Sequence, residues 1–111
     1  MSDWERVEGE VAAIVSARPD EYDAVTRENL AELLRLIKET RRPAPFLAPG
    51  YWPTFRIVWE VKGSENLEIE VFDDRYEVYR SFDGRTDIWY EHHRPGEPLS
   101  APFLSELPDP T

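Results

Sequence analysis

Residues 54 to 92 alternate apolar and polar side chains, and this period of two constrains the fold more than any other feature of the chain. Short polar segments interrupt the alternation at residues 63–66, 73–74 and 83–84. The last of them, Asp83-Gly84, is among the strongest short signals for a hairpin. We therefore predict a four-stranded antiparallel meander with strands over residues 54–62, 67–73, 76–82 and 86–92.

The first forty or so residues carry the period of a helix instead. Ser2-Asp-Trp-Glu5 has the form of a capping box, in which two side chains satisfy first-turn amides reciprocally. The helix predicted over residues 3–17 has one apolar stripe, made of Trp4, Val7, Val11, Ile14 and Val15. Thr26 is expected to cap a second helix over residues 26–41, whose stripe consists of Leu30, Leu33, Leu34 and Ile37.

Helices followed by hairpin-linked strands place the chain in the α+β class. We predict a single domain over residues 1–111, in which the two N-terminal helices pack on one face of the four-stranded sheet. Pro43, Pro45 and Pro49 predict an extended connector that needs no ladder hydrogen bonds. Residues 94–111 hold five prolines, so we expect them to form an extended strap or a loose tail rather than a central strand.

The second face of the predicted sheet also carries apolar side chains. Ile57, Trp59, Ile69 and Val71 form the clearest core set, whereas Val58, Phe72, Tyr79 and Trp89 have the opposite parity. A sheet with helices on one face is normally polar on the other, and a large uncovered apolar patch is unusual in a monomer. We therefore expect a cover, either from the strap through Phe103, Leu104 and Leu107 or from a partner chain.

The formal net charge of −10 constrains the partners. An acidic chain repels phosphate backbones, which argues against direct nucleic-acid binding, and its surface is complementary to a basic protein. The chain has no cysteine, so it forms no disulfide and no cysteine-ligated zinc site, which fits a cytoplasmic protein. We see no secretory leader and no apolar run long enough to span a membrane, and expect no membrane association.

Catalytic patterns are weak. His92 and His93 are the only histidines, and neighbours on a strand face opposite sides, so they chelate one metal poorly. Glu68 and Glu70 share one strand face at about 7 Å, a separation that glycosidase carboxylates also use, but solvated glutamates on a sheet are far more common. No nucleophile elbow or phosphate-binding glycine loop is present. We predict no catalytic residue, no metal and no cofactor.

The segment from Pro43 to Val71 resembles a family of small, uncharacterised bacterial proteins. The resemblance is carried by Pro49-Gly50, Phe55-Arg-Ile-Val-Trp59, Leu67-Glu-Ile-Glu-Val71 and Asp83-Gly84. It implies a helical first half, a proline-rich connector and antiparallel strands, and it implies no known catalytic residues.

These observations favour a small acidic module that binds another protein and catalyses nothing. Antitoxins and immunity-type inhibitors of basic partners have this size and charge. We predict that aromatic side chains anchor the contact while glutamates steer it, through Trp52, Glu68, Glu70, Phe72, Glu77, Tyr79 and Trp89. The first alternative is a structural or accessory subunit that self-associates, as a homodimer, through the second sheet face. The second is a hydrolase that uses the carboxylates of Glu68 and Glu70.

Overall fold

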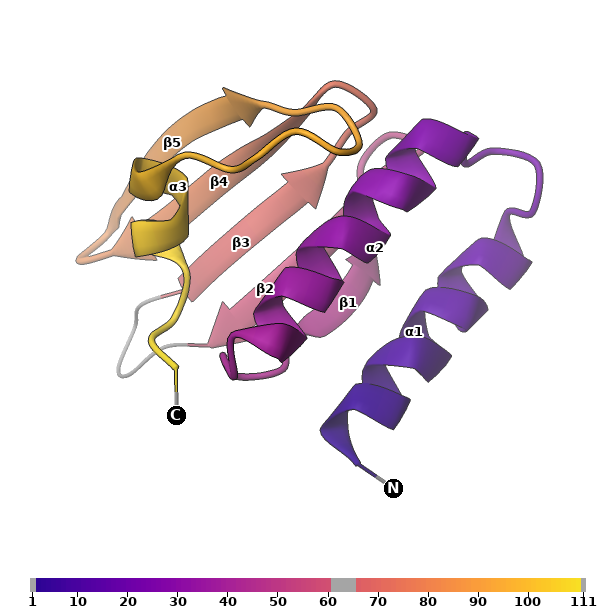
Figure 1. The fold of residues 1–111 in the computed structure, drawn as a ribbon, viewed down its shortest axis with the longest axis horizontal. Helices are drawn as coiled ribbons and strands as arrows, with labels where there is room; N and C mark the ends of the chain where they lie inside the picture. Colours follow the sequence, from indigo (N-terminus) through magenta and orange to yellow (C-terminus); the bar gives the residue numbers. More distant parts are fainter. Residues whose placement is uncertain (1, 61–65, 111) are drawn as a thin grey trace.

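The computed structural model describes residues 2–60 and 66–110 and has an α+β fold built on an antiparallel sheet, as predicted (Figure 1). The elements in chain order are α1 (Asp3–Ala17), α2 (Ala24–Glu39), β1 (Phe46–Pro49), β2 (Phe55–Glu60), β3 (Asn66–Val71), β4 (Arg75–Phe82), β5 (Arg85–His92) and α3 (Ala101–Glu106). The strands lie in sequence order, and each is antiparallel to the next. Residues 61–62 of the predicted first strand and residues 63–65 of its loop lie outside the described residues.

The ends of the two long helices follow from local hydrogen bonds. Ser2 and Glu5 form the predicted capping box at the start of α1. The predicted start of the second helix at Thr26 is wrong, because Asp23 is the cap and its carboxylate accepts from the Thr26 amide at 2.7 Å. Aspartate is at least as good an N-cap as threonine, so the helix begins two residues earlier. It also ends at Glu39, short of the predicted residue 41.

The proline-rich connector contains a strand that the sequence did not predict. β1 pairs with β2 from Phe46 opposite Val58 to Pro49 opposite Phe55. β1 lies at the edge of the sheet, where a proline removes no interior ladder bond. Helix α1 covers this edge, since the Leu47 amide donates to Glu10 Oε1 at 3.2 Å and Arg6 donates to the Pro45 carbonyl at 3.0 Å.

The core lies between the sheet and the helices. Helix α2 contributes Leu30, Leu33 and Ile37, and the sheet contributes the alternating residues predicted for its inner face. The buried apolar residues of β2, β3 and β4 are Phe55, Ile57, Trp59, Leu67, Ile69, Val71, Tyr76 and Val78. A buried asparagine, Asn29, joins α2 to the chain after β3, because its amide donates to the Phe72 and Asp73 carbonyls at 3.0 and 3.2 Å.

The C-terminal tail covers the inner face and not the second one. Ser100 caps the short helix α3, and Phe103 is fully buried, 5.4 Å from the Tyr76 ring and 6.0 Å from the Trp89 ring between centroids. The expectation that Phe103, Leu104 and Leu107 cover the second face is therefore wrong, and so is the placement of Trp89 on that face. Trp89 pairs with the core residue Val78, and cross-strand partners point to the same side of a sheet. No described helix is long and apolar enough to cross a bilayer.

Candidate interaction surface

The face of the sheet opposite the helices has no helix over it in the part of the chain that the structure describes (Figure 1). We call it the open sheet face. The strand register assigns its side chains, because directly paired residues share a face. Its central members, from β1 to β5, are Phe46, Ala48, Arg56, Val58, Glu68, Glu70, Glu77, Tyr79, Ile88 and Tyr90.

Several of these side chains are large, apolar and exposed. Phe46 is 52% exposed on β1, and Ile88 and Tyr90 are 63% and 58% exposed on β5. Two further aromatic residues, Tyr51 and Trp52, are 78% and 67% exposed in the loop between β1 and β2. Five of the six large hydrophobic side chains that are exposed in the described structure thus lie on the open sheet face or its adjoining loop. Exposed aromatic groups of this kind are enriched at protein interfaces.

The aromatic loop is held tightly at its base. The Gly50 amide donates to the Thr54 carbonyl at 2.9 Å, and the Thr54 amide donates to the Trp52 carbonyl at 2.6 Å. A Cβ atom at Gly50 would lie 1.8 Å from Thr54 Oγ1, so only glycine fits this close approach. The loop therefore presents Tyr51 and Trp52 from a closed, hydrogen-bonded turn.

Arg56 connects that loop to the centre of the sheet. Its guanidinium donates to the Pro49 carbonyl at 3.1 Å and to Glu68 Oε1 at 2.9 Å, and it lies 5.1 Å from the centroid of the Tyr51 ring. Both members of the Arg56–Glu68 ion pair are about three-quarters buried. Glu68 is therefore neutralised by its neighbour on β2 and does not present an unpaired charge.

Glu70 is the most buried charged residue of the open sheet face, with 3% of its surface exposed. The Thr54 hydroxyl donates to its carboxylate at 2.5 Å. Glu70 thereby fastens the end of the aromatic loop to β3. Its role in the structure is to hold Thr54, and it offers little surface to a partner.

Glu77 organises the β4 side of the face. One oxygen accepts from Arg75 at 2.8 Å and the other from the Tyr79 hydroxyl at 2.7 Å. Burial of the ring, reinforced by the hydrogen bond to the Glu77 carboxylate, raises the pKa of Tyr79 far above its ordinary value. The hydrogen bond to Glu77 likewise raises the pKa of Arg75, whose guanidinium also lies 3.9 Å from the Phe72 ring centroid.

The structure thus places six of the seven predicted contact residues on the open sheet face or beside it. Trp52 is exposed, Phe72 and Tyr79 are half-buried, and the three glutamates are engaged by Arg56, Thr54 and Arg75. Trp89 faces the core. Sequence reasoning missed Phe46, Tyr51, Ile88 and Tyr90. Ile88 and Tyr90 can be assigned to this face only from the pairing of β4 with β5. That pairing starts at the Asp83-Gly84 turn, where Phe82 lies opposite Arg85.

The histidines and the Glu68/Glu70 pair do not converge on a common site in the described structure. The described residues contain no group of three or more His, Cys, Asp or Glu side chains that could hold a metal ion. His92 is exposed on the open sheet face, whereas His93 is 2% exposed and stacks on Tyr76 within the core. Two cavities on the helical side of the sheet contain neither Glu68 nor Glu70.

Comparison with known proteins adds no relative from which a role could be taken. The resemblance of residues 43–71 to a bacterial family therefore stays a prediction. Neither the protein-family models, nor the curated proteins, nor the solved structures contain a match to this chain.

Proposed function

We propose that this protein is a non-catalytic interaction module that binds another protein through its open sheet face and the loop of Tyr51 and Trp52. The observation that carries the proposal is the exposure of Phe46, Ile88 and Tyr90 on the open sheet face and of Tyr51 and Trp52 in the loop that adjoins it. Tryptophan, tyrosine and arginine dominate the binding energy of protein interfaces. Because each glutamate is paired within the protein, covering this face with an apolar partner surface costs less desolvation free energy than covering unpaired carboxylates would.

The net charge of −10 supports a basic partner. A charge imbalance of this size speeds the encounter with an oppositely charged protein, and the effect weakens as salt screens it. An antitoxin or an immunity-type inhibitor of a basic enzyme is the class of protein that this combination fits. Glu68, Glu70 and Glu77 are each bound by a neighbouring side chain. Under this proposal they therefore speed association through the electrostatic field of the whole molecule and not through direct contacts with the partner.

Self-association through the same face is the second candidate. It is favoured by Ile88 and Tyr90, which are large, exposed and on the open sheet face of β5. A homodimer would bury the aromatic side chains without any other partner. The hydrolase alternative has less support, because the Glu68 and Glu70 carboxylates are already bound to Arg56 and Thr54.

Photocrosslinking in the source cells tests the proposal. A benzophenone amino acid at Ile88 should give one discrete crosslinked species, whereas the same probe at Ala13, an exposed position on α1, should not. Trp52→Ala and Tyr90→Ala should each weaken binding of the purified partner at least about tenfold. Equal crosslinking from both positions would rule the open sheet face out. A crosslinked homodimer that also sediments as a dimer when purified would select the self-association alternative.

A further inference from the structure

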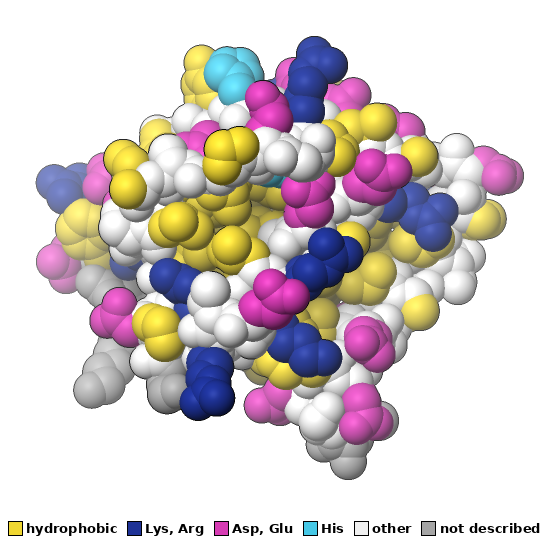
Figure 2. Space-filling view, in the orientation of Figure 1, with side chains coloured by type: hydrophobic (Ala, Val, Ile, Leu, Met, Phe, Trp, Pro, Cys, Tyr) yellow, Lys and Arg dark blue, Asp and Glu magenta, His cyan; other side chains and the backbone are white. Residues whose placement is uncertain are grey.

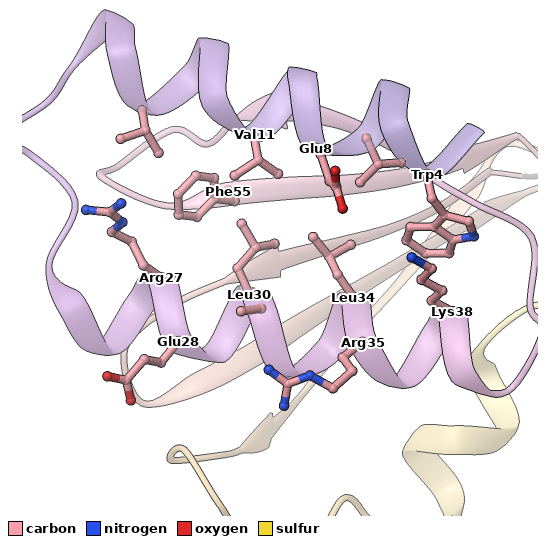
Figure 3. A pocket seen from close by; sticks show the side chains of 13 residues that line it. Trp4, Glu8, Val11, Arg27, Glu28, Leu30, Leu34, Arg35, Lys38 and Phe55 are labelled. Atoms are coloured by element: carbon pink, nitrogen blue, oxygen red, sulfur yellow. The ribbon is translucent and has the colours of Figure 1, made fainter. Parts of the chain in front are cut away.

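A groove on the helical side of the molecule has the features of a second binding site. Helices α1 and α2 flank a hollow of about 570 Å³, whose floor includes Phe55 of β2. Figure 3 shows Val11 of α1 and Leu30 and Leu34 of α2 pointing into the space between the helices. Its size lies within the range of about 300–1,000 Å³ that ligand sites occupy. We call it the α1–α2 groove.

The groove is open to solvent along its length. Val7, Leu30 and Phe55 at its base are buried, but Trp4, Val11, Val15 and Leu34 are only partly covered, and Ala31 is exposed. Figure 2 shows hydrophobic side chains at the bottom of hollows on this face, with Lys and Arg side chains beside them. Half-covered apolar side chains on two neighbouring helices leave a site that a third apolar stripe can fill.

Four charged residues of α2 line one wall of the groove, and three of them are cations. Arg27, Arg35 and Lys38 are exposed and no described carboxylate pairs with any of them, while Glu28 is the one acidic residue of this wall. The opposite wall, on α1, contributes one charge, Glu8. A second hollow of about 520 Å³ shares Trp4 and Lys38 with the groove and is also lined by Asp3, Arg41 and Arg42. With three cations and one carboxylate, the α2 wall of the groove carries a charge of +2, although the whole chain carries a net charge of −10.

The spacing of these cations decides what kind of ligand fits. Arg27 and Lys38 are eleven positions apart on α2, which corresponds to about 16 Å along the helix axis. One carboxylate head group cannot reach both, so a fatty acid or a similar anion leaves part of the wall unpaired. A helix bearing several carboxylates on one flank can meet all three cations over about three turns.

We propose that the α1–α2 groove binds an amphipathic helix of a partner protein, with the helix's apolar stripe in the groove and an acidic flank against α2. Glu8 determines the direction in which the bound helix lies in the groove, because the flank of that helix that contacts α1 must not be acidic next to Glu8. The outer side of the docked helix is polar and faces water, which an extended acyl chain in an open groove cannot achieve. The site lies on the opposite side of the sheet from the open sheet face and does not depend on the function proposed for that face.

A pair of synthetic peptides tests this proposal on the intact protein. Each has about 14 residues with leucines at helical spacing; one carries glutamates on one flank and lysines on the other, and the second carries the same leucines with glutamates in place of the lysines. Titration calorimetry should give binding of the first peptide about threefold tighter than of the second, because Glu8 attracts the lysines of the first peptide and repels the glutamates that the second places against α1. Equal affinity for the two peptides would overturn the proposal.

Matched variants locate the binding. Ala31→Gln places a polar side chain in the groove, while Ala13→Gln makes the same change at an exposed α1 position outside it. Ala31→Gln should weaken peptide binding about tenfold and Ala13→Gln should not. Circular dichroism and thermal unfolding confirm that both variants are folded. An equal effect of the two changes would show that the peptide binds elsewhere.

Removing the positive charges of α2 measures their contribution to peptide binding. The triple variant Arg27→Gln, Arg35→Gln and Lys38→Gln should bind the first peptide about tenfold more weakly, because the acidic flank of the peptide loses the cations that it faces. A control with Arg18→Gln, Arg85→Gln and Arg94→Gln has the same net charge and should retain most of the affinity for that peptide. Palmitate serves as a third probe. If palmitate binds the groove and the first peptide does not, the occupant is an acyl anion and the helix proposal fails; binding of neither probe also contradicts it.

Discussion

At the scale of single residues, Tyr79 shows how polar groups on the open sheet face are satisfied by hydrogen bonds within the protein. Its ring is half-buried, and its hydroxyl donates to a carboxylate that Arg75 already holds. Ionising this phenol would place a negative charge next to Glu77 in a partly desolvated site. The folded protein therefore keeps the Tyr79 proton at a pH where an unfolded chain has lost it.

This retained proton predicts a pH dependence of stability. An unfolded tyrosine titrates near pH 10. Below about pH 10 both states hold the proton and Tyr79 adds no pH dependence; above it only the unfolded state releases the proton, so the free energy of unfolding falls as the pH rises. Burial also raises the pKa of Tyr76, so that residue contributes in the same direction.

Tyr79→Phe should remove one of these contributions. Between about pH 9 and pH 11, the variant should lose about 1 kcal/mol less unfolding free energy than the unchanged protein. Urea unfolding at several pH values measures the difference, and phenolate absorbance reports which form is present. Identical pH dependence in the two proteins would show that the Tyr79 phenol ionises equally easily in the folded and unfolded states.

At the scale of elements, the two faces of the sheet differ in what their aromatic side chains do. Phe103 of α3 is completely buried against Tyr76 and Trp89, whereas Tyr90 of β5 is 58% exposed. Phe103→Ala should therefore cost about 3–5 kcal/mol of unfolding free energy, the usual range for a buried phenylalanine. Tyr90→Ala should cost much less. Urea unfolding of both variants checks this, and similar losses would mean that the open sheet face is covered within the folded monomer.

Two elements escaped prediction, and each has a physical reason. β1 is only four residues long and ends at Pro49, so its strand signal is short and its prolines argue against a ladder. It forms because an edge strand tolerates proline and because Glu10 of α1 accepts from its Leu47 amide. That contact joins residues far apart in the sequence, and no local pattern contains it.

Helix α3 had a readable signal that the five prolines of the tail obscured. Ser100 is a good cap, Pro102 lies in the first turn where proline is tolerated, and Phe103 and Leu107 are one helical turn apart. The period of two predicted β2, β3, β4 and β5 well, because one buried face dictates it. The candidate surface was harder to predict, since its exposed residues follow from the register and from where the tail packs.

At the scale of the whole molecule, the elements differ in how many of their residues are buried and in how many neighbours they pair with. Helix α2 buries Thr26, Asn29, Leu30, Leu33 and Ile37, whereas α1 buries only Val7 and Ile14 and stands apart from α2 across the groove. β3 has a strand on each side, while β5 is paired on one side only. Local opening should therefore require less free energy in α1 and β5 than in α2 and β3.

Native-state hydrogen exchange measures this order directly. Amides of β3 and α2 should exchange slowest, and those of α1 and the outward-facing amides of β5 should exchange faster. A peptide that fills the α1–α2 groove should slow exchange in α1 specifically, while a protein bound to the open sheet face should not. Uniform protection across both helices would contradict the unequal attachment that the burial pattern implies.

Arg56 gives the aromatic loop a property that exposure alone does not. By bonding the Pro49 carbonyl and Glu68 while lying against the Tyr51 ring, it fixes the backbone beneath Tyr51 and Trp52 before any encounter takes place. Freezing a mobile side chain on association costs about 0.5–1.5 kcal/mol of conformational entropy, and part of that cost is here already met during folding. Tyr51 is therefore partly preorganised for a partner that recognises its position.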